Sequence, residues 1–200
     1  MPAGPSEVMV VCDETANESF IAADLLSQAE HGVDSQVVLV STDENKIKLV
    51  QEEIEKQLKD LSRNDIALGA LANSIAIVTE KENISRIVNQ YAPEHLILNT
   101  AFNDEIIPKI INAGSVFIGE YTPESAGDYA SGTNHTLPTN GYARQYSGVS
   151  VDSFVKKITF QKISKEGLLN IGQAVELMAE AEGLDAHKNA ITIRLNTISK

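Results

Sequence analysis

Short apolar runs rich in β-branched residues recur through the chain before position 120. They occupy positions 8–12, 36–41, 74–79, 95–99 and 115–119. Between them, apolar residues recur at the spacing of a helix that faces a core. Because such runs leave no polar face for solvent, the pattern predicts an α/β fold whose mostly parallel sheet is covered by helices on both sides. Doubly wound, Rossmann-like sheets of this kind often bind nucleotides.

Three of the predicted helices are the best defined. One runs from Ser19 to His31, where Gly32 is expected to end it. A second carries a continuous apolar face, formed by Ile47, Val50, Ile54, Leu58 and Leu61. A third contains Ile84 and Val88 and ends before Pro93, because proline disfavours helical backbone in the residue before it.

The composition changes after Gly119, where a polar stretch reaches to about position 148. It is too polar to be core and too long for an ordinary connection, which favours a functional loop. Beyond it we expect a short extended stretch at 154–161, a helix at 165–182 and a terminal amphipathic segment. The chain therefore divides into a Rossmann-like domain, 1–150, and a mostly helical extension, 151–200. An extension of this kind needs a surface to cover its apolar stripe, on its own domain or on another subunit.

The composition limits the kinds of molecule that the chain is expected to bind. A net charge of -12 with few basic residues argues against nucleic acid and anionic membranes. The single cysteine, Cys12, lies in an apolar run, so no intrachain disulfide can form and a buried strand position is favoured over a reactive thiol. Without an apolar stretch of roughly 18 residues or a signal peptide, the sequence indicates a soluble, cytoplasmic protein. Because the residues around Pro2 and Pro5 read as a loop entering a sheet, the chain is compatible with a start inside a longer polypeptide.

Common catalytic motifs are missing, including GxGxxG, the P-loop, GxSxG and HExxH. The four histidines stand out instead, because each is accompanied by an amide or a carboxylate. His31 lies three residues after Gln28, His95 follows Glu94, His135 lies in the polar loop, and His187 follows several acidic residues. Taken singly, each histidine can be explained without a functional role, as a cation at the end of a helix, a solvated residue at the start of a strand or a surface residue. Together, imidazole and oxygen donors suit a metal such as zinc.

Several longer motifs carry a specific resemblance. They are Pro2–Glu7, Ser27–Gly32, Ala92–His95, Ser125–Pro138 and Ala186–Asn189. Over essentially all 200 residues, the sequence resembles histidinol dehydrogenase, but only the second half of that enzyme. The family is zinc-dependent and NAD-linked, and it oxidises L-histidinol to L-histidine through a bound aldehyde in the last step of histidine biosynthesis.

The resemblance implies a role for each motif residue. The zinc ligands would be Gln28, His31, Asp128 and His187. His95 would act as the base toward the alcohol, and Glu94 would activate the water that hydrates the aldehyde. Ser6, His135 and Glu182 would contact the substrate together with the ligands and His95.

The family also builds each site across a homodimer, so the C-terminal extension would reach into the partner's site. Most nicotinamide contacts would come from the N-terminal half that this chain lacks, and the isolated chain is therefore expected to be inactive. Two other functions stay open at this point: a non-catalytic flavodoxin-like binding or assembly module, and a metal-dependent hydrolase. The motif residues would also lie at helix ends entering strands, whereas ligands of doubly wound sheets usually bind at the carboxyl ends of strands.

Overall fold

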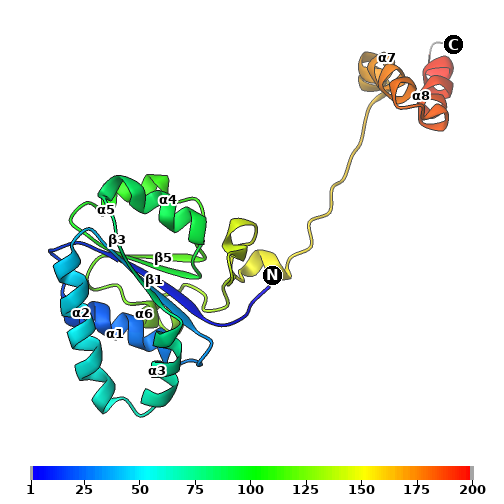
Figure 1. Ribbon diagram of the computed structural model, residues 1–200. Helices are drawn as coiled ribbons and strands as arrows, with labels where there is room; N and C mark the ends of the chain where they lie inside the picture. Colours follow the sequence, from blue (N-terminus) through cyan, green and yellow to red (C-terminus); the bar gives the residue numbers. More distant parts are fainter. Residues whose placement is uncertain (1, 199–200) are drawn as a thin grey trace. The chain divides into compact units, whose positions relative to one another are not determined.

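The computed structural model describes residues 2–198. Its internal contacts divide the chain into two compact units, residues 1–154 and 155–200, each of which is described by itself (Figure 1). The first unit contains the sheet and the second contains two helices.

The sheet of the first unit has five strands in the order β3-β2-β1-β4-β5. The strands are β1 (Glu7–Cys12), β2 (Gln36–Ser41), β3 (Ile75–Val78), β4 (His95–Asn99) and β5 (Ser115–Ile118). All four pairings are parallel. The predicted α/β fold with a parallel sheet is thus confirmed, and the order is that of a Rossmann-type sheet, not of flavodoxin.

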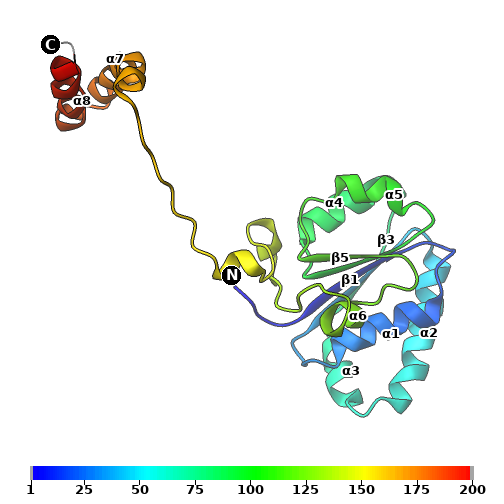
Figure 2. The same cartoon turned by 180° about the vertical axis from the view of Figure 1, so that it is seen from behind.

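Helices cover both faces of this sheet (Figure 2). The helices of this unit are α1 (Glu18–Ala29), α2 (Glu44–Gln57), η1 (Leu58–Asp60), α3 (Asn64–Ala72), α4 (Lys81–Tyr91), α5 (Asn103–Ile106), η2 (Ile107–Lys109), α6 (Glu124–Tyr129), η3 (Tyr142–Arg144) and η4 (Val151–Phe154). Alternate residues of β1 point to opposite faces, so Val8 and Val10 join one apolar cluster with α1, α2 and α3. Met9 and Val11 join a second cluster with α4 and α5. Burial on both faces explains why the central strands β1, β2 and β4 are continuous apolar runs in the sequence.

Two helices differ from the sequence-based expectation. α1 ends at Ala29, two residues before His31, and Gly32 is not among the glycines with positive φ. Helix α3 was not predicted, because its buried positions are the small residues Ala67 and Ala70, which give a weak periodic signal.

The polar stretch after Gly119 is not a solvated loop throughout. It contains helix α6, and Glu124, Leu137 and Thr139 in it are buried. The expectation that this stretch is too polar to be core was therefore wrong at these positions. Glu124 can be buried there because it has a partner: Ser27 Oγ donates to its Oε1 at 2.9 Å.

The second unit is a pair of helices, α7 (Lys165–Ala181) and α8 (Asp185–Ile198), which confirms the predicted helical extension. Gly183 has φ of 70°, a left-handed conformation that lets the chain turn sharply between the two helices. The stretch expected to be extended, 154–161, forms no strand. None of the helices in residues 2–198 is long and apolar enough to cross a membrane.

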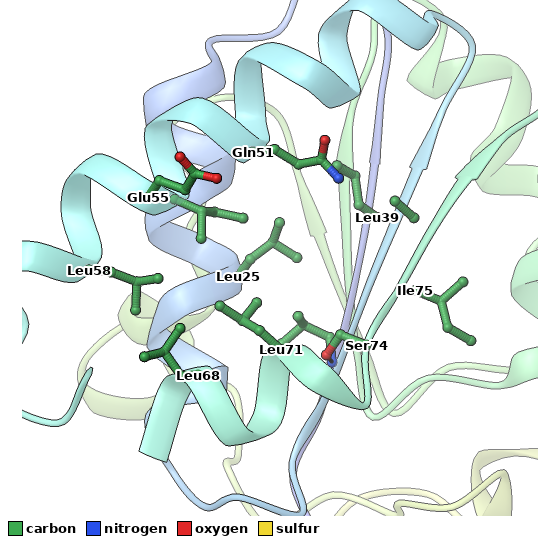
Figure 3. A pocket seen from close by; sticks show the side chains of 12 residues that line it. Leu25, Leu39, Gln51, Glu55, Leu58, Leu68, Leu71, Ser74 and Ile75 are labelled. Carbon is green, nitrogen blue, oxygen red and sulfur yellow. Dashed lines mark hydrogen bonds between the residues drawn. The ribbon is translucent and has the colours of Figure 1, made fainter. Parts of the chain in front are cut away.

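An apolar hollow of about 440 Å³ opens between α1, α2, α3 and β3 (Figure 3). Its walls are mainly aliphatic, with Leu25, Leu58, Leu68 and Leu71 among the residues that face it. None of the four histidines lines it. The candidate chemistry therefore lies elsewhere in the unit.

Candidate active site

The pair Glu94 and His95 lies at the amino end of the sheet. Helix α4 ends at Ala92, whose φ of 59° is left-handed, and Pro93 then directs the chain into β4, which begins at His95. The pairing of Val8 with His95 places the start of β1 beside this histidine. Only 5% of Glu94 and 2% of His95 is exposed, so the reading of a solvated strand-start pair was wrong.

The opposite, carboxyl end of β1 and β4 is closed by a buried aspartate. Asp13 follows β1, and its Oδ2 accepts a hydrogen bond of 2.7 Å from the Ala101 amide beyond β4. Its other oxygen accepts bonds from Thr15 N and Oγ1 at 2.9 and 2.5 Å. Asp13 thus ties together the two loops that would flank a ligand in the usual crevice. The protein's own hydrogen bonds therefore occupy the carboxyl end of β1 and β4, whereas the motif residues lie at the amino end.

His95 is held in one tautomer by the backbone of β1. Its Nδ1 lies 3.1 Å from the carbonyl oxygen of Glu7. Because a carbonyl oxygen can only accept, Nδ1 carries the proton and Nε2 has the lone pair. Nε2 is buried, has no hydrogen-bond partner among the described residues and lies 3.6 Å from Asp128 Oδ1. Burial lowers the pKa of His95, so the ring is neutral and suited to accept a proton.

Glu94 is the second titratable group of the pair. Its Oε2 accepts a hydrogen bond of 2.9 Å from the Glu7 amide and lies 3.6 Å from His95 Nδ1. Burial raises the pKa of Glu94 to about 7, an effect that the nearby carboxylates Glu7 and Asp128 increase. A carboxyl group with this pKa can both accept and release a proton near neutral pH.

A third buried acid, Glu124, was missed by sequence reasoning. It is the first residue of α6 and only 2% exposed. Ser27 Oγ donates to its Oε1 at 2.9 Å, and its Oε2 lies 3.9 Å from His95 Nδ1. Burial raises the pKa of Glu124 to about 8. No signal in the sequence sets this glutamate apart, because its partners come from a helix 97 residues earlier.

Glu94 and His95 face a cavity of about 410 Å³. Its lining consists of Ser6, Gln28, His31, Glu94, His95, Asp128, Tyr129 and His135. Seven of the nine residues expected from the motifs therefore meet around one cavity. Tyr129 is an addition, and it is exposed by 88%.

The other two predicted residues belong to the second unit. Glu182 is the C-cap of α7, and His187 lies in the first turn of α8. Both side chains are exposed in this unit. They are not among the residues that line the cavity.

Comparison with known proteins identifies the family. The profile of the family described as Histidinol dehydrogenase matches residues 1–195. The chain belongs to the histidinol dehydrogenase family. It is 61% identical to "Histidinol dehydrogenase" of Bacteroides fragilis (strain YCH46) over 201 residues, which is 100% of this chain and 47% of that protein. The protein of the same name from Vibrio parahaemolyticus is 56% identical, again over 100% of this chain and 47% of its own length.

A solved structure agrees with these relatives. "Crystal Structure of Histidinol Dehydrogenase from Elizabethkingia anophelis" superposes with a TM-score of 0.96 at 59% identity and covers 100% of this chain. That match takes in 46% of the solved chain. The present chain thus spans slightly less than half the length of the histidinol dehydrogenases that it matches.

The donor set in the cavity can be compared with the zinc that this family uses. Gln28, His31 and Asp128 offer an amide oxygen, an imidazole and a carboxylate, all of which zinc accepts in proteins. Within residues 2–198, no three His, Cys, Asp or Glu side chains lie close enough to hold a metal ion by themselves. Only His31 and Asp128 of the three are of those types, so this result does not exclude the set. The donor types fit zinc, and a complete coordination shell needs at least one more ligand.

Proposed function

We propose that this chain provides the zinc- and substrate-binding part of a histidinol dehydrogenase. The reaction is the NAD-dependent oxidation of L-histidinol to L-histidine through the aldehyde, in the cytoplasm. The observation that supports this best is the cavity in which the Glu94–His95 pair, Gln28, His31 and Asp128 meet, within a chain matched by the family profile over residues 1–195.

His95 acts as the base of both oxidation steps. Its unprotonated Nε2 accepts the hydroxyl proton of histidinol while the carbon gives its hydride to NAD, which leaves the aldehyde. Glu94, whose pKa is about 7, takes a proton from the water that adds to the aldehyde. A second hydride transfer from this hydrate to a second NAD gives the carboxylate of histidine. Two hydrides and three protons therefore leave the substrate carbon, its oxygens and the added water, and one water enters.

Zinc, when bound, would orient the substrate's imidazole and amino group. Gln28, His31 and Asp128 would hold it from this cavity, with His187 as the fourth ligand. Ser6, His135 and Glu182 would contact the substrate. We further propose that His187 and Glu182 reach the site of a second copy in a homodimer, because both are exposed on a unit that carries many exposed apolar side chains.

The metal site is tested by measuring zinc bound to the purified chain and to two variants. His31→Ala should lower bound zinc strongly, because it removes an imidazole ligand. His135→Ala is the matched control: it removes an imidazole from the same cavity that is assigned to the substrate, and it should keep the zinc. Equal zinc in the wild-type chain and in His31→Ala would refute the ligand assignment.

The catalytic assignment needs the missing part of the protein. Since most nicotinamide contacts are expected outside this chain, the chain alone should form little or no NADH from histidinol. Substantial NADH formation by the 200 residues would contradict this part of the proposal. The alternative of a non-catalytic module is separated by calorimetry, because such a module should give no zinc-dependent heat when titrated with histidinol.

A further inference from the structure

Glu124 is a buried acid that has no role in the proposed reaction. It is 2% exposed, and its Oε2 has no hydrogen-bond partner among the described residues. A carboxyl group in such a place loses much of its hydration, so its contacts must account for its presence. Those contacts connect helix α6 to the last turn of helix α1.

Glu124 Oε1 faces two groups of α1. Ser27 Oγ donates to it at 2.9 Å, and the amide of Gln28 lies beside the same oxygen. Only one orientation of this amide satisfies its neighbours: its nitrogen donates to Glu124 Oε1 at 2.8 Å and its oxygen accepts from the Glu7 amide at 3.2 Å. In the reverse orientation, the amide NH₂ of Gln28 would face the Glu7 N–H, so that two donors would meet, and the amide oxygen would face Glu124 Oε1.

Both neighbours fix this orientation, but Glu124 is the one that contributes a side chain to it. The Glu7 amide already donates to Glu94 Oε2 at 2.9 Å, so it does not depend on Gln28. The Gln28 nitrogen, by contrast, has Glu124 as its acceptor. Because Gln28 is 1% exposed, water cannot readily replace that acceptor.

We propose that Glu124 is a positioning residue that holds the Gln28 amide with its nitrogen turned into the protein, so that the amide oxygen is the end offered to a metal ion in the cavity. The consequence for metal binding rests on the proposed function, in which Gln28 is a ligand. Partners that orient a metal ligand in this way change metal affinity by about 10- to 100-fold when they are removed. Glu124 Oε2 also lies 3.9 Å from His95 Nδ1, so one carboxyl group borders both the predicted ligand and the predicted base.

The orientation is tested directly by NMR of the Gln28 side-chain amide in the full 200-residue chain without metal. In the wild-type chain, we expect nuclear Overhauser contacts from the Gln28 NH₂ protons to the Glu124 side chain. Glu124→Gln should keep this orientation, because its amide oxygen can still accept from Gln28. Ser27→Ala is the matched control, since it removes the other donor to the same oxygen and should leave the Gln28 signals in place. Contacts from the NH₂ protons to the Glu7 amide proton, or loss of the orientation in Glu124→Gln, would overturn the proposal.

The effect on metal binding is measured by titrating Zn²⁺ alone into the same proteins. Glu124→Ala should weaken Zn²⁺ binding by about 10- to 100-fold, whereas Glu124→Gln and Ser27→Ala should stay within about threefold of the wild type. Wild-type affinity in a folded Glu124→Ala chain, together with a loss in Gln28→Ala, would overturn the positioning role. If Gln28→Ala itself binds Zn²⁺ normally, the ligand assignment of the proposed function fails, and the NMR contacts alone decide what Glu124 does. Should Glu124→Ala unfold, the NMR contacts of the Gln28 amide in the wild-type and Glu124→Gln chains still decide the proposal.

Discussion

His95 Nδ1 lies 3.1 Å from the carbonyl oxygen of Glu7, a residue 88 positions earlier in the sequence. The contact exists because β1 and β4 are neighbours in the parallel sheet, with Val8 paired to His95. The carbonyl group of Glu7 on β1 therefore sets the tautomer of the His95 imidazole on β4. The chemistry expected of His95 therefore depends on strand pairing.

The tautomer of His95 can be observed. Long-range ¹H–¹⁵N spectra of the wild-type chain should show the Nδ1–H form for His95, because Glu7 O can only accept a hydrogen bond. Exposed His135 serves as the reference and should show the mixture found for a solvated imidazole. A His95 ring protonated only on Nε2 would contradict the geometry and would remove the lone pair assigned to the base.

Gly114→Ala should destabilise the first unit and disturb Glu94. A Cβ atom at position 114 would lie 2.4 Å from the Glu94 carbonyl oxygen and 3.2 Å from Leu137 Cβ. Because the first of these atoms is backbone, relief requires a shift of the chain at the start of β4, where Glu94 and His95 lie. We expect the free energy of unfolding to fall by about 1–3 kcal/mol in urea titrations.

The control for this variant is Gly4→Ala. Gly4 is exposed, and an added Cβ there meets only Thr139 Oγ1, at 3.3 Å. Its unfolding curve should overlay that of the wild type. Equal stability of Gly114→Ala and the wild type would show that the close packing of residue 114 against Glu94 is not a constraint in solution.

Asp24 should make the chain less stable as the pH rises toward neutrality. Burial raises the pKa of this carboxyl from 3.8 to about 7. Since the folded pKa lies above the unfolded one, the stabilising contribution of the neutral acid is complete below about pH 4 and is lost as the pH rises through about 7. Asp24→Asn keeps a neutral group at every pH, so its melting temperature should fall less between pH 5 and pH 8.

The control for Asp24→Asn is a variant that removes a carboxylate from an exposed position. Asp104→Asn, on the opposite side of the sheet, should follow the wild type between the two pH values. The Asp24 carboxylate is also one of the charges that raise the pKa of Glu124, so Asp24→Asn removes this coupling together with the buried carboxyl. Parallel melting curves for the wild type and Asp24→Asn would refute the assignment of the effect to Asp24.

The edge strand β3 should promote self-association of this chain. It is unpaired on one side, and Ile75 and Val78 on it are 50% and 52% exposed. Ile75 also borders the apolar hollow of Figure 3. Val78→Lys should reduce light scattering on warming, because a charge on an edge strand opposes pairing with another chain. Ile111→Lys, which places the same charge at a residue that is 78% exposed outside the sheet, should have a smaller effect. Equal effects of the two lysines would point to net charge instead of the edge.

The sequence by itself determined the fold class and most of the cavity. The central strands β1, β2 and β4 are buried on both faces and leave continuous apolar runs, and the edge strands β3 and β5 are also apolar, so all five could be predicted from residue type alone. The motifs of a characteristic family gave Gln28, His31, His95 and Asp128 as residues of one site, and all four line the same cavity.

Only the tertiary structure decided how these side chains act on one another. The tautomer of His95 depends on a carbonyl from another strand, and the burial of Glu94 depends on packing that a strand-start position does not reveal. The burial of Glu124 could not be predicted from the sequence, because a glutamate in a polar stretch is usually solvated and its partners come from a helix 97 residues away. Hydrogen bonds and desolvation depend on distances between atoms, and those distances are set by how strands and helices pack, not by the order of residues along the chain.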